Sequence, residues 1–427
     1  MLFFELLQVA IGNRQRLSYT PSAEEWNDLY ALARKQTMVG IAFRGVELLP
    51  KEQRPDKALL RRWGMATERI KAKNVELNSK TLVVANKFLC DGFPGIVLKG
   101  QGIAKLYNDN DNDNVDENDN ENSKSSSLKV CANRMQNQAS LNYAEVQPKL
   151  NNVVVTAHSP YTLNSKQEPL SHYRTSGDID IWLKGERKEV IDYVRRHVPN
   201  CKAVYHHVDF PVVKGLDIEV HFTPTWMNSP ITNRRLQWFF DECAEHSVLN
   251  VNDDDDENDN DKLTAHRYTE IPSPSLVFNR VYILVHIYRH LFAEGIGLRQ
   301  LLDYYYVLRQ GFTEEERDET MATLRSLKMQ RFAGAVMWVL QHVFAMDDRY
   351  LLTAPDEREG QFLLGEIMLA GNFGKYDERL QHEQGESALR WGWRKVKRNF
   401  RFVRSYPSEV LWSPLFKIWH YFWRKGQ

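Results

Sequence analysis

The segment 174–183 sets two carboxylates two residues apart inside an apolar run. Side chains alternate between the two faces of a strand, so Asp178 and Asp180 share one face while Ile179 and Ile181 share the other. Adjacent carboxylates repel each other unless a cation or a proton intervenes, and hard oxygen ligands favour Mg²⁺ together with substrate phosphates. The pattern predicts a strand that carries a metal site. A solvated strand edge without a metal is the alternative, because short motifs of this kind often occur without function.

Two further alternating runs lie at residues 206–213 and 216–222. A Lys-Gly pair joins them, which indicates a β-hairpin with a tight turn. In the second run Asp217, Glu219 and His221 share one face, with apolar residues on the other. If this strand lies beside the Asp-x-Asp strand, a third carboxylate joins the pair.

A third segment, 96–102, has the pattern of a short buried strand that runs into a Gly-rich turn, and a helical stretch follows at 103–107. Backbone N–H groups at such a helix start, with Lys99 beside them, suit a triphosphate. The alternative is a Gly-rich turn that serves only tight packing.

Together these segments resemble the DNA polymerase β-like nucleotidyltransferase superfamily, and more closely the bacterial nucleotidyltransferase family proteins. The shared elements are the Leu-Lys-Gly turn at 98–100, Arg174 before the Asp-x-Asp pair, and the Glu-x-His strand at 219–221. The string Gly-Asp-Ile-Asp-Ile-Trp, at 177–182, is the most specific of them.

The resemblance implies an α+β fold with a polymerase β-like core, in which a mixed sheet flanked by helices carries the three carboxylates on adjacent strands. Asp178 and Asp180 would bridge two Mg²⁺ ions, and Glu219 would complete the site of the ion that activates an acceptor hydroxyl. A nucleoside triphosphate, with ATP as the default, would donate its nucleoside monophosphate and release pyrophosphate. The residues predicted to bind this nucleotide are Lys99, Gly100, Gln101, Arg174, Ser176, Gly177 and Arg299.

The acceptor stays open between a small molecule, a protein and an RNA. No nucleophile elbow, Walker-type loop or His-Glu-x-x-His motif competes with this interpretation. Gln101 stands where many polymerase β-like enzymes have the Ser of a Gly-Ser pair. A non-catalytic nucleotide- or RNA-binding protein that retains the fold is therefore the alternative function.

Two polar tracts divide the chain. Residues 108–168 are rich in Asp, Asn and Ser, and their low hydrophobicity predicts a largely disordered insertion between the phosphate turn and the Asp-x-Asp strand. An EF-hand-like pattern within this tract lacks the required Gly and Glu, which argues against Ca²⁺ binding. The predicted domains are an N-terminal helical region at 1–90, a nucleotidyltransferase core at 91–250, an acidic loop at 251–263 and a C-terminal helical region at 264–427.

Helical patterns surround the core. A capping box at 22–25 predicts a helix start, and a long helix is expected from Arg61 to Cys90. Another helical region, 274–310, carries His286 and His290 one turn apart. They could form a metal pair, but no Glu completes the helical zinc motif, so a packed, structural role is favoured.

Arg299 and Asp303 lie in a Gly-Leu-Arg-x-Leu-x-Asp element within this helical region. Members of the resembled family carry a similar element. The expectation is that Arg299 reaches a phosphate and that Asp303 orients it.

The last forty or so residues mix tryptophans with arginines and lysines. Such a tail suits a nucleic acid or an anionic membrane surface, and the alternative is a helical subdomain that buries its tryptophans. The sequence predicts no transmembrane segment and no signal peptide, and its four cysteines lack metal or redox spacing. A cytoplasmic location is therefore expected.

Overall fold

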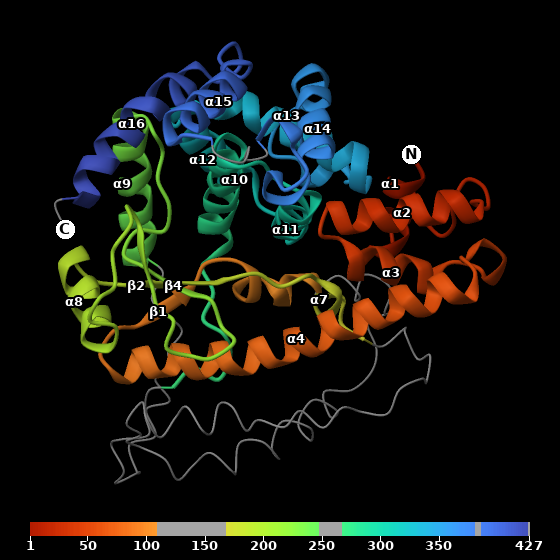
Figure 1. The fold of residues 1–427 in the computed structure, drawn as a ribbon, viewed down its shortest axis with the longest axis horizontal. Coiled ribbons are helices and arrows are strands. Elements are labelled where there is room, and N and C mark those ends of the chain that lie inside the picture. Colours follow the sequence, from red (N-terminus) through yellow and green to blue (C-terminus); the bar gives the residue numbers. More distant parts are fainter. Residues whose placement is uncertain (109–167, 247–266, 381–385, 426–427) are drawn as a thin grey trace, which may run out of the picture.

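The computed structural model describes residues 1–108, 168–246, 267–380 and 386–425. These parts form a mostly helical α+β fold with one four-stranded mixed sheet (Figure 1). The predicted α+β class is confirmed. The predicted acidic loop at 251–263 lies outside the described residues, as does the predicted insertion at 108–168 apart from its two end residues.

Four helices form the N-terminal region: α1 (Leu2–Ala10), α2 (Ala23–Lys35), α3 (Val39–Leu48) and α4 (Lys57–Cys90). The predicted capping box is present at the start of α2, where Ser22 and Glu25 bond reciprocally. Helix α4 begins at Lys57 rather than at Arg61, because the Asp56 side chain accepts hydrogen bonds from two backbone N–H groups of the first turn.

The sheet contains β1 (Gly95–Val97), β2 (Ile179–Leu183), β3 (His207–Asp209) and β4 (Ile218–His221), in the order β1-β2-β4-β3. Strands β2 and β4 are parallel, while β1 and β3 pair antiparallel at the two edges. In this register Asp180 lies opposite Glu219. The two predicted acidic strands are therefore direct neighbours.

The predicted hairpin of β3 and β4 is confirmed, and a turn forms at the predicted Lys214-Gly215 pair, where Leu216 N donates to Val213 O at 3.1 Å and Gly215 has φ +79°. Both strands are shorter than expected, and residues 210–217 connect them. Phe210, Val213 and Leu216 of this connection are buried in the sheet core. Burial of these side chains holds the connection against the core, so it does not continue as paired strand.

After β1 the chain forms two short 3₁₀ helices, Gly100–Gly102 in the predicted Gly-rich turn and Ala104–Tyr107 in the predicted helical stretch at 103–107. A side chain at Gly102 would begin 2.0 Å from the backbone oxygen of Val97, so only glycine fits this close approach. The backbone N–H of Ser171 donates to Asn108 Oδ1 at 3.3 Å. The described segment that begins at residue 168 therefore lies beside the end of the segment that stops at residue 108. The short helix α7 (Leu170–Tyr173) follows directly.

One face of the sheet is covered by α4 and by α8 (Arg187–His197), which share an apolar core with the strands. The other face turns toward α10 (Leu276–Ala293), where Trp182 stacks on Phe278 at 5.8 Å between ring centroids. Because side chains alternate, Ile179 and Ile181 point to the first face and Asp180 to the second. Figure 1 shows the sheet between α4 and the upper helices.

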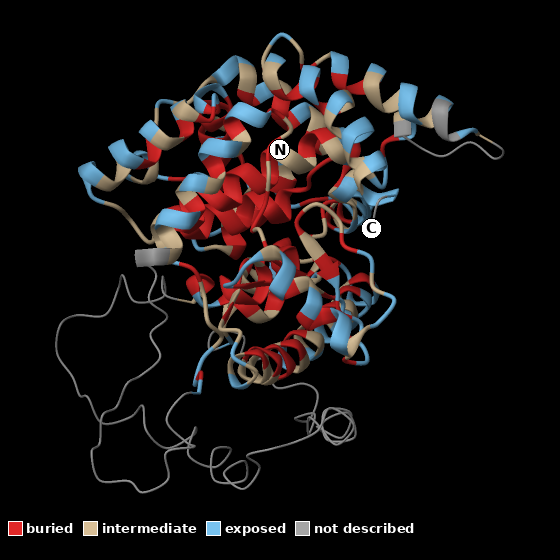
Figure 2. Cartoon of the chain, turned by 90° about the vertical axis from the view of Figure 1, so that its left-hand side faces the viewer, coloured by how far each residue is buried: buried red, intermediate tan, exposed pale blue. Residues whose placement is uncertain are grey.

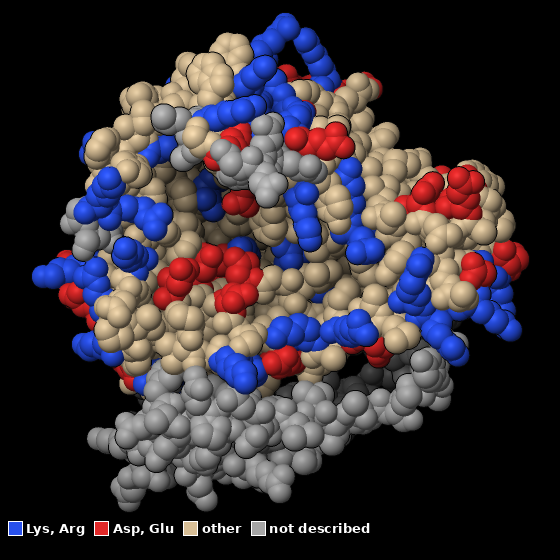
Figure 3. All heavy atoms as spheres, viewed as in Figure 1, with Lys and Arg blue, Asp and Glu red and all other residues tan. Residues whose placement is uncertain are grey.

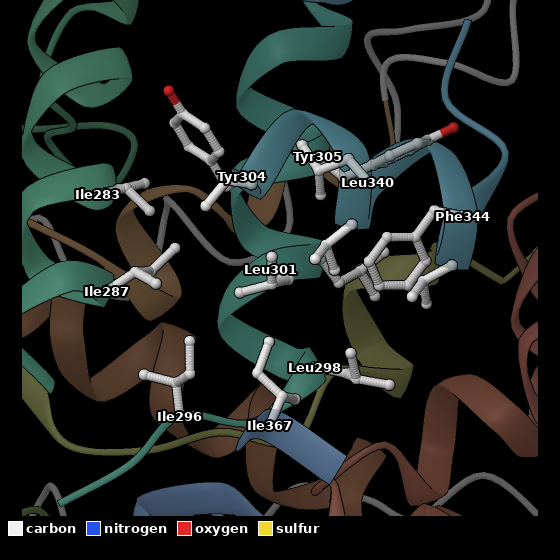
Figure 4. Close-up of a cluster of buried hydrophobic side chains, with 14 of the residues drawn as sticks. Ile283, Ile287, Ile296, Leu298, Leu301, Tyr304, Tyr305, Leu340, Phe344 and Ile367 are labelled. Atoms are coloured by element: carbon white, nitrogen blue, oxygen red, sulfur yellow. The ribbon is translucent and has the colours of Figure 1, made fainter. Parts of the chain in front are cut away.

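The remaining helices build a larger apolar core above the sheet (Figure 2). Side chains of α11, including Leu298 and Leu301, lie between those of α10 and α13 at its centre (Figure 4). These remaining helices are α9 (Pro230–His246), α11 (Leu298–Arg309), α12 (Glu314–Ser326), α13 (Gln330–Phe344), α14 (Glu357–Ala370), α15 (Ala388–Phe400) and α16 (Pro407–Lys425).

Helices α15 and α16 form the basic aromatic tail. Trp393, Trp412 and Trp419 are exposed, so the alternative of a subdomain that buries its tryptophans is wrong for these three. Trp423 differs, because the guanidinium of Arg187 lies over its ring at 4.4 Å. None of the described helices combines the length and apolarity that a membrane span requires.

Candidate metal and nucleotide site

Three carboxylates converge on the sheet face that turns toward α10. Asp178 directly precedes β2, Asp180 lies in β2 and Glu219 lies in β4. One oxygen from each lies within 4.8 Å of the others. The parallel β2–β4 pairing produces this convergence, because it aligns Asp180 with Glu219. Asp217, which was expected on the same face, is exposed and does not belong to this trio.

The ammonium group of Lys99 lies among these carboxylates. Its Nζ is 2.9 Å from Asp180 Oδ2 and 3.2 Å from Asp178 Oδ1. A backbone hydrogen bond from Leu98 N to Asp180 O, at 2.9 Å, holds this segment against β2. Lys99 was predicted to contact phosphates, and here it neutralises the site in the way that a bound cation would.

Burial and neighbouring charges shift the carboxylate pKa values in different directions. Burial, followed by the charge of Asp180, raises the pKa of Asp178. Burial also favours the neutral form of Asp180, but Lys99 and His221 outweigh it and hold the pKa of Asp180 below its usual range. The pKa of Glu219 is lowered against burial in the same way, chiefly by His221. Cationic groups therefore outweigh burial at Asp180 and Glu219 but not at Asp178, where burial and the neighbouring carboxylates prevail and the pKa is raised. A divalent ion among the three carboxylates would favour the ionised form of each.

Arg174 lies behind the trio and forms a bidentate ion pair with Asp303 of α11. Its Nε and Nη2 donate to the two carboxylate oxygens at 2.6 and 2.7 Å. Tyr107 donates to the same carboxylate at 2.5 Å. The prediction that Asp303 orients Arg299 is wrong: Asp303 binds Arg174, which fits the flat carboxylate with two parallel bonds.

Arg299 itself points to the loop before β2. Its Nη1 donates to the backbone oxygen of Thr175 at 3.0 Å. The same nitrogen lies 3.3 Å from the point where a side chain on Gly177 would begin. Glycine at 177 therefore leaves room for the guanidinium beside Asp178.

The other predicted nucleotide-binding residues divide into two groups. Gly100 has φ +60° and, like the exposed Gly177, lines a small cavity beside Asp178. Gln101 is buried, and its amide donates to Asn78 Oδ1 of α4 at 2.7 Å, so its side chain serves a contact with that helix. Ser176 is half-buried and is not one of the described residues that line the cavity.

Three cationic side chains, those of Lys99, Arg174 and Arg299, line this cavity together with the carboxylates of Asp178 and Asp303. Its volume is about 20 Å³, which is room for about one water molecule. Lys99 closes the carboxylate side of this cavity. Figure 3 shows the surface hollowed between the upper helices and the sheet, with acidic and basic side chains around the hollow.

A histidine cluster beside Glu219 was not among the predicted site residues. His207 Nδ1 lies 3.2 Å and His221 Nε2 lies 3.4 Å from Glu219 Oε2. Burial lowers the pKa of His207 to about 4, whereas Asp180 and Glu219 overcome burial and raise the pKa of His221 to about 9. The signal in the sequence was the His-His pair at 206–207 together with the Glu-x-His strand, but only their pairing brings them together.

His286 and His290, the pair considered from the sequence, lie on α10 with their ring centroids 4.4 Å apart. Among the described residues they belong to no group of three metal ligands. His286 is nearly buried, and Tyr282 packs against its ring at 5.8 Å. This environment fits the packed role that the sequence favoured.

Comparison with known proteins places the chain in a family. The family model described as an uncharacterised nucleotidyltransferase matches residues 22–112 and 163–345. The three carboxylates, Lys99, Arg174 and Arg299 all lie inside these matched segments. No match was found among curated proteins or among solved structures. Since the match covers most of the chain and contains the whole site, this protein belongs to the uncharacterised nucleotidyltransferase family.

Proposed function

We propose that this protein is a Mg²⁺-dependent enzyme with a polymerase β-like core, which transfers a nucleoside monophosphate from a nucleoside triphosphate to an acceptor hydroxyl and releases pyrophosphate. One observation carries the proposal. Three carboxylates from two neighbouring strands converge on a position that the Lys99 ammonium occupies, in a chain that belongs to a nucleotidyltransferase family.

The residues fit two divalent ions. Oδ1 of Asp180 is buried and has no hydrogen-bond partner among the described residues, so this oxygen is available to coordinate a metal ion. Asp178 and Asp180 are proposed to hold both ions, and Glu219 to complete the site nearer the acceptor. When bound, the ions would neutralise phosphate charge and lower the pKa of the acceptor hydroxyl.

The side chains around the trio are proposed to position the donor. Lys99 is free to follow the β- and γ-phosphates once divalent ions replace its ammonium at the carboxylates. Arg174 is held by Asp303 and Arg299 by the Thr175 backbone oxygen, so both guanidiniums are oriented before a phosphate arrives. Transfer of this type needs positioning and charge neutralisation and no protein nucleophile. ATP is the default donor, and the acceptor is a small molecule, a protein or an RNA.

Two measurements test the proposal. Isothermal titration of the wild-type protein with ATP should show binding only when Mg²⁺ is present. Label should pass from α-phosphate-labelled ATP into an acceptor of a cell lysate. Asp178→Asn should abolish Mg²⁺-dependent binding and lower transfer by on the order of 10²–10³-fold, because it removes a ligand of the ions that would stabilise the developing negative charge.

Asp217→Asn is the matched control. It makes the same chemical change next to β4 but at an exposed position outside the trio. Equal losses in both variants would argue against the metal assignment. ATP binding without label transfer from any of the four nucleotides would instead support the non-catalytic nucleotide-binding alternative.

A further inference from the structure

Strands β3 and β4 bring three imidazoles to one side of Glu219. Their antiparallel pairing sets His207 opposite His221 and Asp209 opposite Glu219. His206 lies directly before β3, and one ligand atom from each of His206, His207, Glu219 and His221 lies within 4.8 Å of the others. The proposed function uses only the Glu219 carboxylate of this group.

We propose that His206, His207, His221 and Glu219 bind one transition-metal ion of the zinc class, at a second site that shares Glu219 with the carboxylate trio. Imidazole nitrogens select zinc, cobalt, nickel or copper, whereas magnesium prefers oxygen ligands throughout. The two sites are therefore chemically distinct although they touch. This inference goes beyond the proposed function and does not depend on it.

The distances between the ligand atoms suit a tetrahedral ion. His206 Nε2 lies 3.0 Å from His207 Nδ1, and Glu219 Oε2 lies 3.2 Å from His207 Nδ1 and 3.4 Å from His221 Nε2. A tetrahedral zinc site with ligands at about 2.0–2.1 Å has edges of about 3.3–3.4 Å. These three contacts thus lie close to tetrahedral edges before any ion is added.

The outer nitrogens of two imidazoles have partners that orient the rings. His221 Nδ1 lies 3.3 Å from the backbone oxygen of Thr223, and His207 Nε2 lies 3.5 Å from Asp209 Oδ1. A carbonyl or carboxylate at the outer nitrogen is the usual way in which proteins fix the tautomer of a metal-binding histidine. In the neutral imidazole, which is the form that binds a metal, these contacts would turn the lone pairs of His221 Nε2 and His207 Nδ1 toward the cluster.

His221 Nε2 supplies an independent sign of a missing ligand. His221 is 2% exposed, and this nitrogen is buried without a hydrogen-bond partner among the described residues. It points to Glu219 and, at 3.7 Å, to Asp180 Oδ1. Buried polar atoms almost always have a hydrogen-bond partner. An unsatisfied nitrogen that is one of four clustered ligand atoms therefore supports the presence of an ion.

Aromatic packing closes the outer side of the cluster. The indole of Trp226 packs on His206 at 4.1 Å between centroids, and the guanidinium of Arg289 lies over that indole at 3.9 Å. An apolar wall of this kind limits the access of water and strengthens the binding of a metal at the imidazoles.

The test uses the full-length protein after removal of metals with a chelator. Cobalt(II) is the probe, since its visible absorption becomes intense in tetrahedral nitrogen and oxygen coordination, and zinc is then titrated against it. We expect one equivalent of cobalt with a tetrahedral spectrum that zinc bleaches. The double variant His207→Gln/His221→Gln should lower cobalt affinity on the order of 100-fold or more.

Two control variants make the result specific. His286→Gln/His290→Gln changes another close pair of histidines and should leave the cobalt spectrum unchanged. Asp178→Asn should also leave it unchanged while it removes Mg²⁺-dependent ATP binding, so failure of this site and failure of the proposed function are distinguishable. The inference would be overturned if wild-type protein gave no tetrahedral cobalt absorption, or if that absorption persisted in the His207/His221 variant. Circular dichroism of each variant verifies that it is folded.

Discussion

Among the described residues, two groups of close histidines stand out, and only the group on the sheet combines with a carboxylate into a set of possible metal ligands. His207 and His221 flank Glu219 on the sheet, with ring centroids 5.2 Å apart. His286 and His290 are even closer, at 4.4 Å on α10, yet no acidic side chain completes a group of three ligands there among the described residues. The difference teaches that two close imidazoles alone are too few ligands for a metal site, and that the remaining ligands must come from other elements, as Glu219 does in the proposed site.

Two buried carboxylates, those of Asp180 and Glu409, differ in the direction of their pKa shifts. Asp180 is 1% exposed and lies beside Lys99 and His221, which hold its pKa below the usual range despite burial. Glu409 of α16 is 3% exposed and accepts a hydrogen bond from the Asn228 backbone at 2.9 Å. Burial raises its pKa to about 7. These two buried acids therefore differ in their neighbours, since Lys99 and His221 outweigh burial at Asp180 whereas burial prevails at Glu409.

The largest expected effect on stability comes from the separation of a buried charge pair. Asp303→Asn leaves the guanidinium of Arg174, which is 4% exposed, without its carboxylate. We expect the free energy of unfolding to fall by about 3–5 kcal/mol in a denaturant titration. Glu314→Gln, which removes an exposed partner of Arg317, is the control and should change little. If Asp303→Asn were as stable as the wild type, the ion pair between Arg174 and Asp303 would not contribute to stability.

Glu409→Gln should stabilise the protein in a pH-dependent way. The folded-state pKa of Glu409 is about 7 and its usual value is 4.5, so the stabilisation from its protonated form is complete below 4.5 and is lost as the pH rises through 7. Gln stays neutral throughout. The variant should therefore gain up to about 3 kcal/mol over wild type above pH 7 and nothing near pH 4.5, since each pKa unit corresponds to about 1.4 kcal/mol. A difference that does not vary with pH in urea titrations would contradict this assignment.

Lys99→Met removes the cation from the carboxylate trio while it keeps the side-chain length. With no ammonium to displace, Mg²⁺ alone should bind about tenfold more tightly in isothermal titration. Nucleotidyl transfer should fall, because the phosphates lose a positive partner. Lys105→Met, at an exposed lysine, serves as the control. An unchanged Mg²⁺ affinity would mean that Lys99 does not compete with metal.

The smallest expected effect is the gain of a weak site on α10. Phe373 lies 5.4 Å from the ring of His290 and has φ +53°, a conformation that Asp tolerates better than Phe. Phe373→Asp should add a second equivalent of cobalt, about 10–100-fold weaker than the site at Glu219, because Arg289 Nη2 lies 3.5 Å from His290 Nε2 and its positive charge opposes a bound ion. Phe373→Asn has the same shape without the charge and should add none. Binding by both variants would show that the carboxylate is not the deciding group.

Local patterns predicted much of the fold. The capping box at Ser22, the long helix that ends at Cys90 and the short strand at Gly95–Val97 all depend on neighbours within a few residues. The turn between β3 and β4 was predicted, but the length of their connection was not, because it depends on the burial of Phe210, Val213 and Leu216 in a core that distant helices complete. Alternation alone could not distinguish these residues from strand.

The candidate site was predictable to a similar degree. The trio came from the two acidic strands, since alternation places each carboxylate on a defined face. The partner of Asp303 was not predictable, because helical spacing favours Arg299 whereas the observed partner, Arg174, is 129 residues away. The roles assigned to Gln101 and Ser176 remain predictions, and the contact of Gln101 with Asn78 directs its side chain to α4.

By itself the sequence determined which side chains share a face, because alternation along a strand and spacing along a helix are properties of the local backbone. Only the tertiary structure decided which faces meet. The parallel register sets Asp180 beside Glu219, and the antiparallel register sets His207 beside His221. Strand pairing joins segments that are distant in the chain, and the packing of the whole core selects it, so no local pattern contains that information.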